Sequence, residues 1–131
     1  MRFVILHHTG WPGQADHYDL LLQARESDDD NERVLLAFST QDDLVPLGKE
    51  PLPLARKNNH RKLYLDYQGV VADGRGHVVR VDEGRLLHWS EFDENNEQPW
   101  AFELQGHSLK GHFSLRRSGG NVYQFEKKAG T

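Results

Sequence analysis

The feature that most constrains the fold is a short-range alternation of apolar and polar residues, which recurs in short segments bounded by turn-forming residues. This alternation has the two-residue period of a strand with one buried face, whereas few windows show the i, i+3, i+4, i+7 spacing of an amphipathic helix. We therefore predict an all-β domain. The expected strands are 2–8, 17–24, 33–39, 62–68, 76–82, 84–91, 100–106, 111–117 and 121–128.

Glycines and prolines predict how these strands are connected. The glycines of Ser118-Gly119-Gly120 favour a tight hairpin, and a second tight turn is expected at Glu83-Gly84. Prolines at 46, 51 and 53 disfavour both a helix and a central strand, so residues 40–60 are predicted to form a long loop. Up to nine short strands in a chain of 131 residues indicate a small closed or partly open β-barrel of about eight mostly antiparallel strands.

Composition limits the classes of protein and of site. A length of 131 residues predicts one domain spanning 1–131. No apolar segment approaches the roughly 18 residues of a membrane span, and no signal peptide is evident, so we expect a cytoplasmic protein without a membrane partner. The chain contains no cysteine, so a bound metal would need histidine, carboxylate or water as ligands.

The formal net charge of −4 argues against a globally basic nucleic-acid binder, but the charges are segregated. Acidic residues gather in 26–32 and 90–97, whereas 54–64 and 107–117 are basic and lack acidic residues. These two basic segments would form one basic face if they fold together, and scattered surface cations remain the alternative. The cations of the first segment, which we expect to contact substrate, are Arg56, Lys57, Arg61 and Lys62.

A cluster of polar residues near the N-terminus is the strongest candidate for a site. In the strand HYDLLLQ, the two-residue period puts His17 and Asp19 on the same face. With one more histidine they would suit manganese, zinc or iron, and the alternative is a hydrogen-bonded pair on an exposed strand face. His7 and His8 point to opposite faces of the preceding strand, so at most one of them joins this pair.

Three segments, in the same order, resemble the 3′-phosphoesterase domain of bacterial DNA ligase D and its stand-alone relatives. FVILHH with HYDLLL resembles that family's first strand and its L-H-Y-D-x-R-L-E signature. HRKLYLDYQGVV (60–71) resembles its H-P-x-x-Y-x-x-F-E-G-x-I-P stretch, and FELQGHSLKGHFSLRR (102–117) resembles its closing hairpin. Together these segments extend from residue 3 to 117.

The resemblance implies a β-barrel with a polar interior and a divalent metal, usually manganese, which removes 3′-terminal phosphates and ribonucleotides from DNA ends. The family's metal ligands fall on His8, His17 and Asp19. Its phosphate-contacting histidine and tyrosine fall on His60 and Tyr64, which would share one face of a strand because they lie four residues apart. Partners implied by the resemblance are DNA 3′ ends, including RNA-terminated ones, and a separate ligase or polymerase.

The chain departs from the family pattern beside the metal ligands. Leu21 stands where the family has a phosphate-contacting arginine, and Gln23 stands where it has glutamate. Loss of that arginine would remove transition-state stabilisation, unless Arg56 or Arg61 substitutes for it. The alternative function is therefore a catalytically impaired barrel that binds DNA ends or a phosphorylated ligand. A cupin-like metal or sugar site would need a His-x-His motif with a following glutamate, which this sequence lacks.

Overall fold

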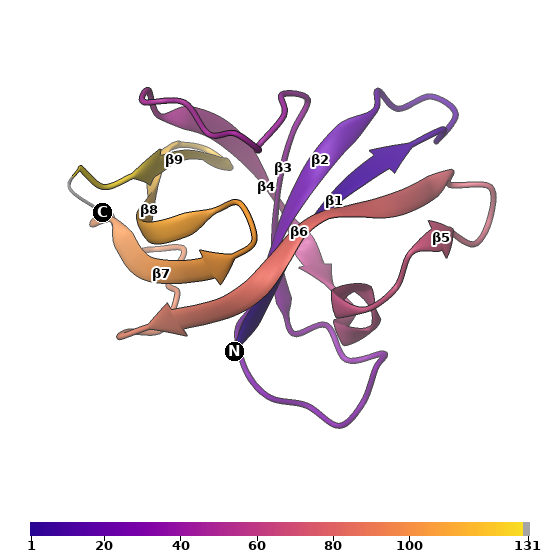
Figure 1. The fold of residues 1–131 in the computed structure, drawn as a ribbon, viewed down its shortest axis with the longest axis horizontal. Helices are drawn as coiled ribbons and strands as arrows, with labels where there is room; N and C mark the ends of the chain where they lie inside the picture. The colour runs from indigo at the N-terminus through magenta and orange to yellow at the C-terminus, as the bar shows by residue number, and fades with distance from the viewer. Residues whose placement is uncertain (130–131) are drawn as a thin grey trace.

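The computed structural model describes residues 1–129 as nine strands and one short 3₁₀ helix (Figure 1). The elements are β1 (Arg2–Thr9), β2 (His17–Gln23), β3 (Leu35–Thr40), β4 (Leu52–His60), η1 (Lys62–Leu65), β5 (Gly69–Val70), β6 (His77–His88), β7 (Trp100–Gly106), β8 (Lys110–Gly119) and β9 (Val122–Lys127). In this part of the chain, none of the helical structure has the length and apolarity of a membrane span.

The strands form one antiparallel sheet that closes on itself. Its order is β1-β2-β3-β4-β9-β8-β7-β6-β5, and an additional pairing between β1 and β6 closes eight of the strands into a barrel, with β5 outside the ring. This confirms the predicted small all-β barrel of mostly antiparallel strands. The glycine hairpin is also confirmed, because β8 and β9 pair directly across Gly119 and Val122.

The barrel interior is apolar, which corrects the expected polar interior. The enclosed cluster takes side chains from all eight barrel strands and is dominated by phenylalanine and leucine. Among them, Phe38, Phe102, Phe113 and Phe125 are fully buried. The physical reason is size, since an eight-stranded barrel leaves just enough room for side chains to fill, and burying unpaired polar groups there would be costly.

A second buried cluster covers the opposite face of β1, β2 and β3. Residues that alternate with those of the interior, such as Val4, Leu6 and Leu21, pack there against Leu65 of η1 and Val71, which follows β5. Figure 1 shows η1 and β5 beside this half of the molecule, away from β7, β8 and β9. Strands β1 to β3 are therefore buried on both faces, and the polar side chains of the candidate site lie on this second face.

The structure differs from the sequence prediction between residues 40 and 68. The predicted long loop is wrong for its second half, which forms β4. Strand β4 tolerates Pro53 because residues 52–54 pair only with β9 while the pairing with β3 begins at Ala55, so Pro53 has an edge position. The predicted strand over 62–68 is also wrong, because residues 62–65 form η1.

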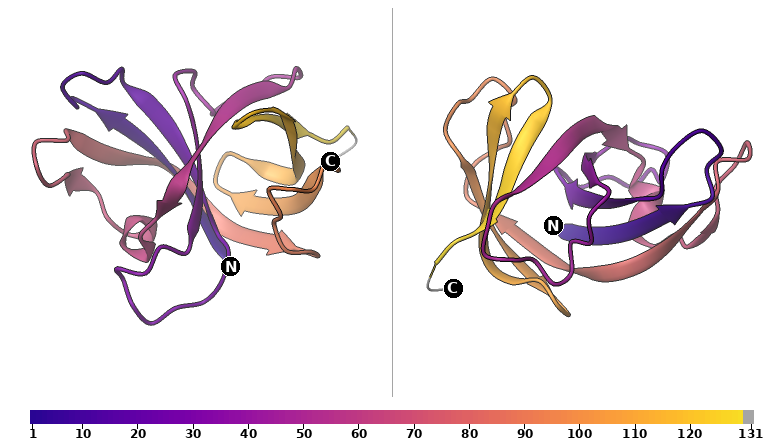
Figure 2. Two further views of the ribbon diagram at one scale, coloured as in Figure 1. Left: turned by 180° about the vertical axis from the view of Figure 1, so that it is seen from behind. Right: turned by 90° about the horizontal axis from the view of Figure 1, so that it is seen from above.

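The predicted turn at Glu83-Gly84 is wrong as well, since β6 is a single strand of 12 residues. Figure 2 shows this strand extending along both halves of the molecule. Gly84 is needed for a close backbone approach rather than for a turn, because a Cβ there would lie 2.0 Å from the carbonyl oxygen of Gln105. The strand pairs with β1 from His77 to Arg85 and with β7 from Gly84 to His88.

Gly76 packs closely against residues 9–11, and a substitution there tests whether this contact stabilises the fold. It has a φ of +77°, and a Cβ there would lie 2.0 Å from the carbonyl oxygen of Thr9. We expect Gly76→Ala to lower the free energy of unfolding by about 3 kcal/mol, as measured by urea denaturation. Gly74→Ala is the matched control, because Gly74 has a φ of +67° but no neighbour near the added Cβ. A loss of about 1 kcal/mol is expected there, and equal losses would contradict the role of close packing.

Candidate functional site

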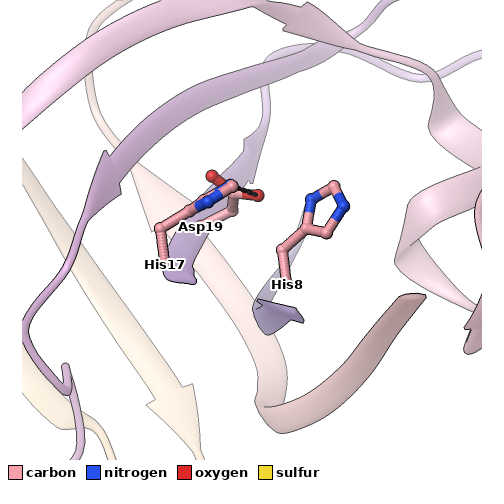
Figure 3. A group of neighbouring side chains, drawn as sticks. All are labelled: His8, His17 and Asp19. Atoms are coloured by element: carbon pink, nitrogen blue, oxygen red, sulfur yellow. Dashed lines mark ion pairs between the residues drawn. The ribbon is translucent and has the colours of Figure 1, made fainter. Parts of the chain in front are cut away.

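His8, His17 and Asp19 converge on the second face of the sheet (Figure 3). The antiparallel register pairs His8 of β1 directly with His17 of β2, and Asp19 follows two residues later on the same face. One potential ligand atom from each residue lies within 4.8 Å of the others. In residues 1–129 this is the one group of three or more such side chains close enough to hold a metal ion.

The choice between His7 and His8 follows from the strand pleat. His7 points to the opposite face, where its ring stacks on that of Tyr18 with centroids 4.2 Å apart. His8 lies on the site face and its ring centroid is 4.9 Å from that of His17. Only His8 of the two therefore approaches His17 and Asp19.

The hydrogen bonds of the two histidines suit metal coordination. Nε2 of His8 donates to the carbonyl oxygen of Arg75 at 2.6 Å, and Nδ1 of His17 donates to that of Ala15 at 3.1 Å. A carbonyl oxygen only accepts, so the other nitrogen of each neutral ring keeps a free lone pair. Metal-binding histidines typically donate their second nitrogen in this way. The donor set of two imidazoles and one carboxylate thus fits a divalent transition metal.

Asp19 is a buried carboxylate with a single ion-pair partner among residues 1–129. Its side chain is 5% exposed, and one carboxylate oxygen lies 3.4 Å from Nε2 of His17. The hydrogen bond that His17 donates to the Asp19 carboxylate raises the pKa of His17 above its ordinary value, although burial opposes this. The pair is therefore not on an exposed strand face, because Asp19 is buried and His17 is half-buried.

The trio lies in a pocket of about 630 Å³, within the size range of small-molecule sites. Leu6, Val71 and Val78 give it an apolar floor. Four cationic side chains line it, and they are Arg33, Lys57, Arg61 and Arg75. Two carboxylates, those of Asp19 and Asp73, face these cations. The lining therefore carries an excess of positive charge in a chain whose net charge is −4.

His60 and Tyr64 line the same pocket, as the sequence predicts. They do not share one strand, as was expected, because His60 is the last residue of β4 and Tyr64 lies in η1. Their ring centroids are 6.0 Å apart. Nδ1 of His60 donates to the carbonyl oxygen of Asn58 at 2.9 Å, which leaves Nε2 as the nitrogen that can meet a ligand.

The four expected substrate-binding cations divide into two pairs. Lys57 and Arg61 line the pocket, whereas Arg56 and Lys62 are not part of its lining. Arg56 lies on the face of Phe38, where its guanidinium group stacks on that ring and forms an ion pair with Glu94 at 3.0 Å. Of Arg56 and Arg61, which were considered as substitutes for an arginine at position 21, only Arg61 therefore lines the pocket.

Two cations that line the pocket, Arg33 and Arg75, were not predicted to belong to the site. Arg33 donates to the carbonyl oxygen of Asn59, and Arg75 lies over the ring of Trp11, which itself stacks near His8. Arg33 begins an expected strand and Arg75 lies in a turn, so neither belongs to the sequence segments that carry the candidate site residues. The signal for Arg75 was its neighbour Gly76, whose tight contact with residues 9–11 brings the Arg75 carbonyl group to His8.

The side chains of Leu21 and Gln23 both make contacts that stabilise the fold. Leu21 is fully buried in the apolar cluster beneath the pocket, and the side chain of Gln23 accepts a hydrogen bond from the backbone N–H of Arg2 at 3.0 Å. Neither residue presents a charge to the site.

No protein-family model and no curated protein matches this sequence. The fold and the site together define a closed antiparallel barrel that carries a His-His-Asp cluster in a cationic pocket on its outer face.

Proposed function

We propose that this chain is a metal-dependent phosphoesterase that acts on nucleic-acid 3′ ends, removing a 3′-phosphate or a 3′-terminal ribonucleotide during DNA end repair. The observation that carries the proposal is that the five residues matched by resemblance, from distant parts of the chain, all line one pocket. They are His8, His17, Asp19, His60 and Tyr64. Manganese is the proposed metal, and zinc or another transition metal is compatible with the same donors.

The charge of the pocket supports a phosphorylated substrate. Its cations exceed its carboxylates, and Arg guanidinium and Lys ammonium groups are the usual partners of phosphate oxygens. The net charge of −4 restricts this attraction to the pocket, so we expect weak, salt-sensitive binding to DNA.

Each site residue has a distinct role in the proposed reaction. A divalent cation held by His8, His17 and Asp19 would supply Lewis acidity and a bound water of lowered pKa. Nε2 of a protonated His60 would donate a hydrogen bond to a phosphoryl oxygen, and the ring of Tyr64 fixes the orientation of His60. Arg61, held over the ring of Tyr64, would bind a second phosphoryl oxygen.

The test is hydrolysis of a labelled DNA primer that ends in a 3′-phosphate or a single ribonucleotide. We expect the wild-type protein to release the end group with Mn²⁺ and not with EDTA. His60→Ala should lower kcat by roughly 10²- to 10⁴-fold, the usual contribution of a proton-donating side chain. His112→Ala is the matched control, because His112 lies on β8 near Glu103 and Trp89, outside the pocket. Turnover that persists in EDTA, or equal loss in both variants, would contradict the proposed roles.

A second candidate function is a binding module that recognises DNA ends or a phosphorylated ligand without turnover. It is favoured by Leu21, which is buried below the pocket and offers no cation to the scissile phosphate. In the same assay it predicts Mn²⁺ uptake and retention of the primer without release of the end group. A separate ligase or polymerase is the proposed partner in either case, since a healed or bound 3′ end must then be joined or extended.

A further inference from the structure

A second depression adjoins the pocket along the sheet. It has a volume of about 450 Å³, and its wall includes Gln14, His17, Ser39 and Lys57, which also line the first pocket. The two hollows are therefore continuous across these side chains. The remaining lining of the second depression includes Thr40, Gln41, Ala55 and Val122, without any carboxylate.

Lys57 stands at the junction of the two hollows. Its position follows from the register, which aligns Leu21 of β2, Ala37 of β3 and Lys57 of β4 in one row across the site face. Among residues 1–129, neither a hydrogen bond nor an ion pair engages the Lys57 ammonium group, which lies close enough to His17 to oppose its protonation.

We propose that the second depression is a subsite for the nucleotide that precedes the 3′-terminal one, and that Lys57 binds the phosphate linking the two. This inference rests on the proposed function and adds to it the residues that would bind the strand beyond its terminal nucleotide. An uncompensated ammonium group between two adjoining hollows matches a chain in which one anionic phosphate separates two neutral nucleosides.

The chemistry of the second depression suits a nucleoside. The hydroxyl and amide groups of Ser39, Thr40 and Gln41 can donate to and accept from a sugar or a base edge, and they carry no charge that would repel the linking phosphate. Grooves that bind single strands place cations along the path of the backbone, as Lys57 would be here. A phosphopeptide would instead place side chains of varied charge in this hollow.

The experiment compares two probes in metal-free buffer by displacement of a labelled oligonucleotide. The probes are thymidine 3′-monophosphate and the thymidine dinucleotide that ends in a 3′-phosphate. Both carry the same terminal group, and only the second has a linking phosphate. We expect the dinucleotide to bind about tenfold more tightly to the wild-type protein. Lys57→Met should reduce this ratio to about twofold and lower the salt slope of dinucleotide binding by roughly 0.7.

Two further variants keep the result interpretable. Ala55→Phe fills the second depression and should also reduce the ratio of dinucleotide to mononucleotide affinity, without weakening the binding of the mononucleotide. Lys110→Met removes a cation of β8 that lies outside both hollows, and it should leave this ratio unchanged. Equal affinity for the two probes, or a ratio unaffected by Lys57→Met, overturns the subsite even if 3′-phosphate hydrolysis occurs. Tighter binding of the dinucleotide that depends on Lys57 supports the subsite even if the protein does not hydrolyse the 3′-phosphate.

Discussion

Replacing His17 by alanine is expected to lower the affinity for Mn²⁺ by at least about 100-fold and to abolish metal-dependent turnover. The physical reason is that His17 is central to the cluster, with its ring beside that of His8 and Nε2 facing Asp19. Its loss would leave one imidazole and one carboxylate, too few protein ligands to hold a transition metal tightly. Affinity is measured by isothermal titration calorimetry with the purified, metal-free protein.

His7→Ala is the matched control for this prediction. His7 precedes His8 on the same strand but stacks on Tyr18 on the other face, so its removal should leave the Mn²⁺ affinity within about threefold. Thermal unfolding gives a second readout, because a ligand that binds only the native state raises Tm by mass action. Mn²⁺ should raise the Tm of the wild type and of His7→Ala, and not that of His17→Ala. If wild type shows no shift and no heat, His17 and Asp19 are a hydrogen-bonded pair and the metal-based reaction is wrong.

The fold class follows from the sequence because alternation has a direct physical cause. A strand that buries only one face keeps a two-residue period, as in residues 100–106, which form β7 as predicted. The prediction fails where tertiary context overrides a local signal. Pro53 argues against a central strand, but its edge position beside β9 removes the conflict. Gly84 suggests a turn, yet it serves the close approach of β6 to β7.

The part of the site that lies on a single strand could be predicted from the sequence. His17 and Asp19 share a face because of the strand period alone, and the structure keeps that arrangement. The choice of His8 over His7 depends on the register of β1 against β2, which the intervening turn sets and the sequence leaves open. Arg33 and Arg75 were not predicted, since they reach the pocket through packing of segments distant in the chain.

Asp82 is a residue that the sequence placed in a strand without further role, yet it ties two parts of the barrel together. The residue is 2% exposed, and its carboxylate accepts hydrogen bonds from the backbone N–H groups of Glu83, His107, Ser108 and Leu109. The last three belong to the connection between β7 and β8. A single side chain therefore satisfies the donors of a tight connection packed against the core, where a Cβ at Gly106 would lie 2.6 Å from the ring of Phe3.

We therefore expect Asp82→Ala to lower the free energy of unfolding by about 4 kcal/mol, the largest stability effect among these predictions, as measured by urea denaturation. The reason is that several buried N–H groups would lose their acceptor, and each such loss costs roughly 1 to 3 kcal/mol. Asp82→Asn should cost less, about 2 kcal/mol, because its remaining oxygen can still accept from Glu83 and His107. Asp93→Ala is the control, since exposed Asp93 accepts from the backbone N–H of Asn95 at the surface, where water can replace it. Equal small losses for Asp82→Ala and Asp93→Ala would show that the connection between β7 and β8 is held by apolar packing rather than by this carboxylate.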